Sequence, residues 1–238
     1  MSIAKIGYFV LTFVVLALVL QAYKAALTRI GKQKKQVNRN VLIVYAASLL
    51  WFVYLYFLGK SEILWSFEMP PRFPLFVFLP LVVLSIVIFA RKANKELIQA
   101  VPKSHVIYFQ SFRIFVELTI LATYYEGIFP IETTFEGYNY EIIIGLIAPL
   151  VAYLVYSKKV LKEWGALLFN IAGLATLLII IGIVITSLYF PAVWGSKPPV
   201  ILPEFTTIPY LLLPGFLAPI ALFTHVLSII QIMRSKKK

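Results

Sequence analysis

The chain has 238 residues, of which 61% are hydrophobic, and its mean hydropathy is +0.90. Its 22 basic residues outnumber its 10 acidic residues, so the formal net charge at pH 7 is +12. This composition excludes an ordinary soluble domain, which is much less apolar. The absence of cysteine excludes disulfides, thiolate metal sites and cysteine nucleophiles.

Seven apolar stretches are long enough to cross a bilayer, which needs about 20 apolar residues per helix. They cover approximately residues 6–27, 41–58, 73–90, 105–129, 140–157, 164–190 and 203–232. Strands of a membrane barrel would alternate apolar and polar residues, whereas the run 177–185 is apolar throughout. The sequence therefore predicts an all-α integral membrane protein, a seven-transmembrane-helix bundle that forms a single membrane domain over residues 1–238.

The basic residues are concentrated in alternate connections of this bundle. They gather after the first, third, fifth and seventh spans, whereas most acidic residues fall in the other connections. By the positive-inside rule, this pattern predicts an N-terminus outside and a C-terminus in the cytoplasm. Anionic lipids are then expected as partners at the cytoplasmic face. A nucleic-acid partner is not expected, because the positive charge follows the predicted topology.

Aromatic residues lie near several predicted span boundaries, where Trp and Tyr commonly anchor helices at the membrane interface. Trp51 and Tyr54 of the second span are two of them. Others are Tyr56, Trp65, Trp164, Tyr189 and Trp194. We expect these side chains to act as interfacial anchors.

Three of the spans that run inward carry an interior proline, namely Pro80, Pro149 and Pro219. Each removes a backbone donor and is expected to kink or break its helix. Membrane proteins tolerate such breaks where protein or a water-lined cavity satisfies the backbone. The fifth and seventh spans also share a phrase, GLIAP at 145–149 and GFLAP at 215–219. It fits either a parallel internal repeat or two independent helices that pack through small residues.

The fourth span contains two charges that cannot be assigned to a loop, Arg113 and Glu117. They share one helix face with Gln110 and Tyr124, so we expect them to face the bundle interior and to pair with each other. A charge near the bilayer centre costs about 2.5–3.5 kcal/mol on insertion scales, and such residues often mark functional sites. The pair is interpreted either as a binding site or as a buried ion pair that fixes helix packing.

A polar layer is predicted at the depth of Arg113. Counting from the predicted cytoplasmic helix ends places Gln21, Ser48, Asn170 and His225 at a similar level. The ligand-binding candidates are Arg113, Glu117, Gln110, Asn170 and His225. Ordinary hydrogen bonds between helices are the alternative explanation of the layer.

A second polar group lies in the predicted outer connection between the fourth and fifth spans. Glu136, Asn139 and Glu141, together with Tyr124, are candidates for an outer vestibule that receives a cation. A turn that caps the fifth helix explains the same residues, and we predict no metal site.

Signatures of catalysis are missing from the sequence. The HExxH and GxSxG patterns are absent. The spacing of His105 and His225 does not indicate haem, and the seventh span has no lysine for a retinal Schiff base. We predict no cofactor and no catalytic residue, and we expect a non-catalytic protein rather than an enzyme.

Several phrases in the second half of the chain are characteristic. They are Phe112-Arg113-Ile114 with Val116-Glu117, Thr134-Phe135-Glu136-Gly137 with Asn139, Gly145-Leu146 with Ala148-Pro149, and Pro219 with His225, Ser228 and Gln231. Through them, residues 107–231 resemble a family of bacterial multi-span inner-membrane proteins that has no assigned function. The resemblance implies a location in the bacterial inner membrane and says nothing about activity.

The broken helices and the charged pair favour a bundle that binds or transports a small solute, an ion or a lipid. The alternative is a non-catalytic sensor or partner subunit of a membrane complex, with a membrane protein as its partner. An intramembrane enzyme is the second alternative. A small molecule retained through purification would favour the binding bundle, and a copurifying membrane protein would favour the subunit.

Overall fold

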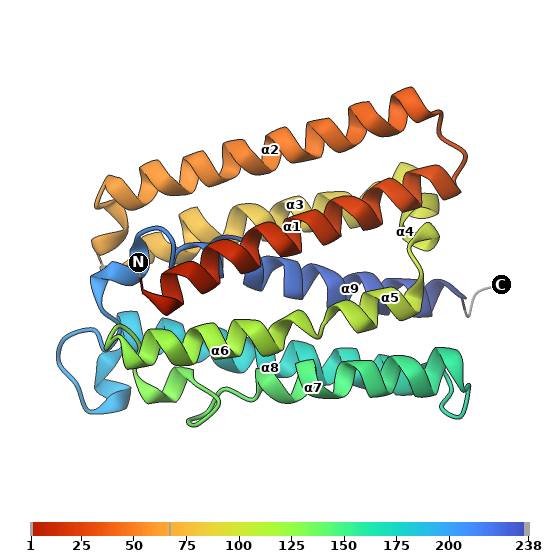
Figure 1. Cartoon of the computed structure of the whole chain (residues 1–238). Coiled ribbons are helices and arrows are strands. Elements are labelled where there is room, and N and C mark those ends of the chain that lie inside the picture. The colour runs from red at the N-terminus through yellow and green to blue at the C-terminus, as the bar shows by residue number, and fades with distance from the viewer. Residues whose placement is uncertain (1, 67, 236–238) are drawn as a thin grey trace.

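Figure 1 shows the computed structural model of the chain, which describes residues 2–66 and 68–235. Within these residues the secondary structure is helical, with no strand. The α-helices are α1 (Ile3–Arg29), α2 (Lys34–Lys60), α3 (Leu79–Ala90), α4 (Lys95–Ala100), α5 (Lys103–Phe109), α6 (Phe112–Tyr125), α7 (Glu141–Ala152), α8 (Glu163–Tyr189) and α9 (Ala218–Ser235). The π-helical turns are η2 (Pro74–Phe78), η5 (Tyr153–Ser157) and η8 (Leu213–Leu217). The 3-10 turns are η1 (Ile63–Trp65), η3 (Lys92–Asn94), η4 (Ile131–Thr133), η6 (Pro191–Trp194) and η7 (Pro203–Thr206).

Helix length and composition support a multi-pass membrane protein. Of the described segments, five are long and apolar enough to cross a membrane: Ile3–Arg29, Lys34–Lys60, Lys103–Tyr125, Glu163–Tyr189 and Leu213–Arg234. A sixth is reached if Pro74–Ala90 is joined to Lys92–Ala100 across a bend of 78°. The predicted span 140–157 forms the apolar helix Glu141–Ser157, which at about 1.5 Å per residue falls short of a bilayer core of about 30 Å. The structure thus supplies five or six spans by this criterion instead of seven.

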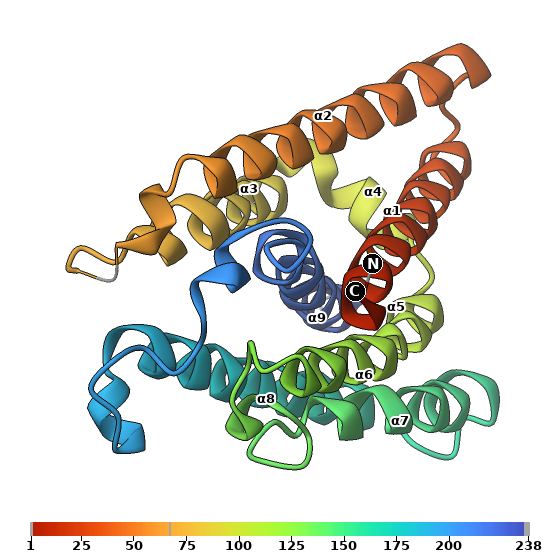
Figure 2. The ribbon, with the colours of Figure 1, turned by 60° about the vertical axis from the view of Figure 1, so that its left-hand side comes forward.

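The long helices run in a common direction and surround α9. Figures 1 and 2 show α9 inside the bundle, with α2 at its edge. α9 packs against α3, α5 and α8, and its extension η8 packs against α1 and η2. By contrast, the buried residues of α2 are only Val37, Leu55, Leu58 and Gly59. The core therefore forms around α9, and α2 is a peripheral helix.

Two helix boundaries differ from the predicted ones. α2 begins at Lys34, so Lys34, Lys35 and Arg39 lie on its first turns and the connection to α1 is short. The last span was expected from residue 203, but a continuous helix starts only at Leu213. Proline cannot donate the backbone hydrogen bonds of a helix interior, and residues 203–212 contain two prolines and form η7 and a further turn. Their apolar composition matches that of a helix, so the hydropathy pattern did not reveal the difference.

Each of the three spans with an interior proline includes a π-helical turn, in which the backbone hydrogen bonds reach one residue further back. η2 ends two residues before Pro80, and η8 ends two residues before Pro219. η5 instead follows Pro149 in the fifth span. The prolines therefore distort their helices locally, and each helix continues past its proline.

A side chain of α2 donates a hydrogen bond to the backbone carbonyl that Pro219 leaves without its usual helical donor. Pro219 lacks the N–H that would bond the Gly215 carbonyl, four residues earlier. The indole Nε1 of Trp51 donates to this oxygen at 2.7 Å. The Trp51 donor thus replaces a missing backbone donor inside the protein, and the residue is more than an interfacial anchor.

The same arrangement recurs at Pro80. The carbonyl that Pro80 leaves without a partner belongs to Phe76, and the hydroxyl of Tyr54 donates to it at 3.1 Å. The rings of Trp51 and Tyr54 also lie next to each other, with centroids 4.9 Å apart. Trp51 and Tyr54 of α2 therefore supply hydrogen-bond donors in place of those that Pro219 and Pro80 remove from two other helices.

Trp51→Phe is expected to destabilise the protein by about 1–2 kcal/mol, because the buried Gly215 carbonyl loses its donor. In a Pro219→Ala background the alanine N–H takes that carbonyl, so the same change should cost about 1 kcal/mol less. Thermal unfolding in mild detergent, followed by circular dichroism, measures both costs. Trp164→Phe, at an exposed tryptophan of α8, is the control and should have little effect. Equal costs of Trp51→Phe in the two backgrounds would contradict the assignment.

The shared phrase of the fifth and seventh spans marks two close helix contacts. A Cβ at Gly145 would lie 2.9 Å from the backbone nitrogen of Ile114, and a Cβ at Gly215 would lie 2.7 Å from the Leu55 side chain. The π-helical turn precedes the proline in the seventh span and follows it in the fifth. Because the local structures differ, packing by small residues accounts for the phrase better than an internal repeat does.

The basic segments gather at one end of the bundle. Figure 1 shows the α1–α2 connection, α4, the connection between η5 and α8 and the C-terminal end of α9 at the same end. These segments carry basic residues such as Lys32, Lys95, Lys158 and Arg234. The turn η1, which follows α2, lies at the other end. The charge segregation expected from the sequence is therefore also a segregation in space.

Candidate functional site

The fourth predicted span is interrupted where the site begins. α5 ends at Phe109 and α6 starts at Phe112, with Gln110 and Ser111 in the turn between them. Arg113 and Glu117 follow on the first turns of α6, and each is only 2% exposed. Both charges are therefore buried inside the bundle, where burial without partners would be costly.

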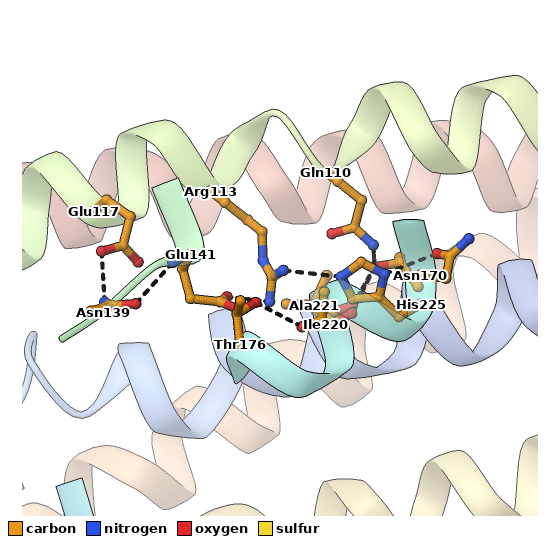
Figure 3. Close-up of polar contacts among 12 residues, drawn as sticks. Gln110, Arg113, Glu117, Asn139, Glu141, Asn170, Thr176, Ile220, Ala221 and His225 are labelled. Carbon is orange, nitrogen blue, oxygen red and sulfur yellow. Dashed lines mark hydrogen bonds and ion pairs between the residues drawn. The ribbon is translucent and has the colours of Figure 1, made fainter. Parts of the chain in front are cut away.

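Arg113 pairs across the bundle, with residues of two other helices. Its Nη2 forms an ion pair with Oε2 of Glu141, the first residue of α7. Its Nη1 lies 3.0 Å from Nε2 of His225 on α9 (Figure 3). The expected pair of Arg113 with Glu117 is thus replaced by a pair with Glu141. The guanidinium reaches across to α7 and α9, and Glu117 has another partner.

That partner is Asn139, in the connection before α7. Asn139 Nδ2 donates to Oε2 of Glu117 at 2.6 Å and to the carbonyl of Thr133 at 3.0 Å. Its Oδ1 accepts from the backbone N–H of Glu141 at 3.1 Å. Asn139 therefore links Glu117 to the start of α7 and holds Glu141 in the position that meets Arg113.

His225 is fixed in one tautomer by its neighbours. A guanidinium can only donate hydrogen bonds, so Nε2 of His225 accepts from Arg113. Nδ1 then carries the hydrogen and donates to Oδ1 of Asn170 at 2.9 Å. Asn170 in turn donates to Oγ of Ser228 at 2.8 Å and to the carbonyl of Ala166 at 2.6 Å. The imidazole is therefore a neutral bridge between the guanidinium and an amide.

These contacts join into one hydrogen-bonded chain. The hydroxyl of Thr176 on α8 binds the second carboxylate oxygen of Glu141. Figure 3 shows the chain running from Glu117 and Asn139 through Glu141 and Arg113 to His225. It brings together side chains from α6, α7, α8 and α9 and from the connection before α7. We call these linked residues the charged cluster: Glu117, Asn139, Glu141, Thr176, Arg113, His225, Asn170 and Ser228.

The predicted polar layer is only partly formed. Gln110 donates to the hydroxyl of Thr224 at 2.9 Å, beside the charged cluster on α9. Gln21 is exposed, and the hydroxyl of Ser48 donates to the carbonyl of Val44 in its own helix at 2.9 Å. Gln21 faces outward on α1, and the Ser48 hydroxyl is used within the peripheral helix α2, so the two residues lie outside the layer.

The four vestibule candidates are separated in the structure. Asn139 and Glu141 are 1% and 4% exposed and belong to the charged cluster. Glu136 is exposed, and Tyr124 is half-buried beside Tyr125, with ring centroids 5.3 Å apart. The connection thus turns two of its polar side chains inward, and the four residues do not line a common outer vestibule.

A glycine allows His225 to approach α8. A Cβ at Gly173 would lie 2.2 Å from Cε1 of His225 and 2.3 Å from Nε2, distances at which atoms overlap. Gly145 likewise allows α7 to approach α6, since a Cβ added at this position would lie 3.3 Å from the Cβ of Arg113. The charged cluster therefore depends on two glycines that bring the helices close together.

An apolar cavity of about 120 Å³ borders the charged cluster. Arg113, Glu117 and Glu141 form its polar side, and every other lining residue is aliphatic, aromatic or proline. The apolar lining comes from η2, α6, α8, η7, η8 and α9. Lining residues such as Phe78 of η2 and Ile181 of α8 are half-buried, so the cavity is only partly enclosed on the side of these two elements.

The sequence contained signals for residues that the prediction missed. On α8, Asn170, Gly173 and Thr176 recur every three residues and so share one face. On α9, Thr224 and Ser228 are four residues apart on the face that includes the histidine. In both helices, the available signal was a small or hydroxyl-bearing residue on the same face as a polar residue already predicted to point inward.

No family model, curated protein or solved structure matches the chain.

Within the described residues, no group of three His, Cys, Asp or Glu side chains could hold a metal ion. The polar groups that line the cavity are one guanidinium and two carboxyl groups, and a neutral imidazole accepts from the guanidinium. Such a site can bind a molecule that has one polar end and an apolar body.

Proposed function

We propose that the chain is a seven-span protein of the bacterial inner membrane, with its N-terminus outside and its C-terminus in the cytoplasm. Seven helical units, α1, α2, η2–α3, α5–α6, α7–η5, α8 and η8–α9, overlap the predicted spans and support this count. The short fifth unit fits a bilayer that thins locally around it. The gathering of basic segments at one end supports the orientation, and that end would contact anionic lipids.

The orientation is tested with single cysteines at two exposed positions, Lys34 and Glu136. Because the natural chain has no cysteine, each variant carries one reactive thiol. In intact cells a membrane-impermeant maleimide should label Glu136→Cys, and it should label Lys34→Cys only after permeabilisation. Labelling of both variants in intact cells would contradict the topology.

The bundle is proposed to bind an amphipathic, lipid-like molecule in the cavity. The observation that carries this function is the composition of the cavity wall, which is apolar except for Arg113, Glu117 and Glu141 on one side. Binding pockets commonly combine an apolar lining with a few convergent polar groups. A molecule dissolved in the bilayer could enter from the partly enclosed side, between η2 and α8.

Packing alone does not explain the cavity. Protein interiors are close-packed, with few voids larger than a water molecule, and this one is close in size to a cavity of about 150 Å³ that binds benzene. The half-buried residues at its rim belong to helices that the proposed topology places against lipid. An acyl or isoprenoid chain is therefore the natural apolar body, with only part of it enclosed.

Native mass spectrometry of the purified protein tests this function. We expect a bound molecule in the natural protein and its loss in Ala218→Leu, which fills the cavity from α9. Ala175→Leu, at an exposed position of α8, is the matched control and should retain the molecule. Thermal unfolding of both variants checks that they are folded.

The result is decisive in either direction. A purified protein without a bound molecule, or one whose bound molecule is unaffected by Ala218→Leu, would contradict the proposal. A copurifying membrane protein in place of a small molecule would favour the partner subunit instead.

A further inference from the structure

One carboxylate oxygen of Glu117 is available as a hydrogen-bond acceptor. Its Oε2 accepts from Asn139, but no hydrogen bond reaches its Oε1 from any residue that the structure describes. Both oxygens of Glu141 are engaged, one by Thr176 and the other by Arg113. Because Glu117 lines the cavity, its Oε1 is the acceptor available to a bound molecule.

The charge balance of the site indicates what this acceptor would bind. Arg113 is occupied by Glu141 and by the neutral His225. With both carboxyl groups ionised, one guanidinium faces two negative charges, so the charged cluster has a formal charge of −1. An unbalanced buried charge is costly, and it can be balanced either by a proton on Glu117 or by a positive charge inside the cavity next to its free oxygen.

We infer that the molecule bound in the cavity is an amphipath with a cationic amine headgroup, and that Glu117 is the residue that recognises it. This inference rests on the proposed binding function and adds the chemical class of the ligand. An ammonium group offers three donors and one positive charge, a hydroxyl offers one donor and no charge, and a carboxylate offers no donor and carries a negative charge. The cavity takes the headgroup and the first part of the chain, and the rest extends out on the partly enclosed side, between η2 and α8.

Three probes with the same chain separate these headgroups: octylamine, octanol and octanoate. The protein is placed in nanodiscs of phosphatidylcholine at pH 7, and the apparent affinity of each probe is measured from the shift in thermal unfolding. Octylamine should bind roughly tenfold more tightly than octanol, as expected for a hydrogen bond with a charged partner. Octanoate should bind most weakly. Empty nanodiscs and Ala218→Leu, which blocks the cavity, correct for partitioning into lipid.

Glu117→Gln gives the second readout. The Gln side chain keeps an acceptor for Asn139 but removes the charge, so octylamine should fall to the affinity of octanol while octanol is unchanged. Octanol or octanoate binding as tightly as octylamine, with the binding lost in Ala218→Leu, would overturn the inference and leave the binding function standing. If none of the probes shows binding that depends on the cavity, the binding function itself fails. If Glu117→Gln does not fold, the ranking of the probes on the natural protein decides.

Discussion

Replacing Glu141 by Gln is expected to lower the free energy of unfolding by about 3 kcal/mol or more, because it leaves the buried Arg113 without its ion-pair partner. The guanidinium is 2% exposed and cannot turn to water without leaving the core. Thermal or detergent-induced unfolding of the purified protein, followed by circular dichroism, measures the loss. Glu136→Gln, at an exposed carboxylate in the preceding connection, is the matched control and should change stability by less than about 0.5 kcal/mol.

A second comparison distinguishes the two carboxyl groups of the site. Glu117→Gln should cost less than Glu141→Gln, since Asn139 can still donate to the new amide oxygen. Adding Arg113→Met to Glu141→Gln should recover part of the lost stability, because the unpaired charge is then removed as well. A larger loss in Glu117→Gln than in Glu141→Gln would show that Glu117 is the partner of Arg113 after all.

Gly173→Ala is expected to destabilise the protein by about 3 kcal/mol. Overpacking of a core typically costs about 1–3 kcal/mol. Here the atom displaced is a ring carbon of His225, 2.2 Å from the new methyl group. Displacing this ring also breaks its hydrogen bonds with Arg113 and Asn170, so the expected cost lies at the upper end of that range.

Gly182→Ala on the same helix is the matched control for this substitution. A Cβ at Gly182 has no neighbouring atom within 4 Å, and alanine is a better helix former than glycine by about 1 kcal/mol. This variant should therefore be as stable as the natural protein or slightly more stable. Equal stability of the two alanine variants in thermal unfolding would contradict the close contact between α8 and His225.

The helical class and the approximate positions of the helices could be predicted because both follow from the local apolar pattern. The run of α8 is predominantly apolar for seven turns, and its ends at Glu163 and Tyr189 fall within one residue of the predicted span. Prediction was less accurate where proline interrupts an apolar run, as it does before Leu213. Hydropathy measures transfer into lipid, whereas a helix also requires backbone donors.

The partner of Arg113 could not be predicted from spacing along one helix. The rule that residues four positions apart can pair is local, and it nominates Glu117. The observed partner, Glu141, comes from another helix and is positioned by Asn139, which faces inward from a connection. Such a contact depends on how four helices pack. The burial of the two charges could be anticipated because their desolvation cost demands partners inside the protein.

The hydrogen bonds of α2 give this peripheral helix a mechanical role. Trp51 and Tyr54 tie it to η8 and η2, and these two turns form adjoining parts of the cavity wall. Both turns are hydrogen-bonded to the same helix, so a tilt of α2 would strain both hydrogen bonds at once. The packing of this peripheral helix is thereby linked to two segments of the cavity wall, although α2 contributes no residue to the cavity lining.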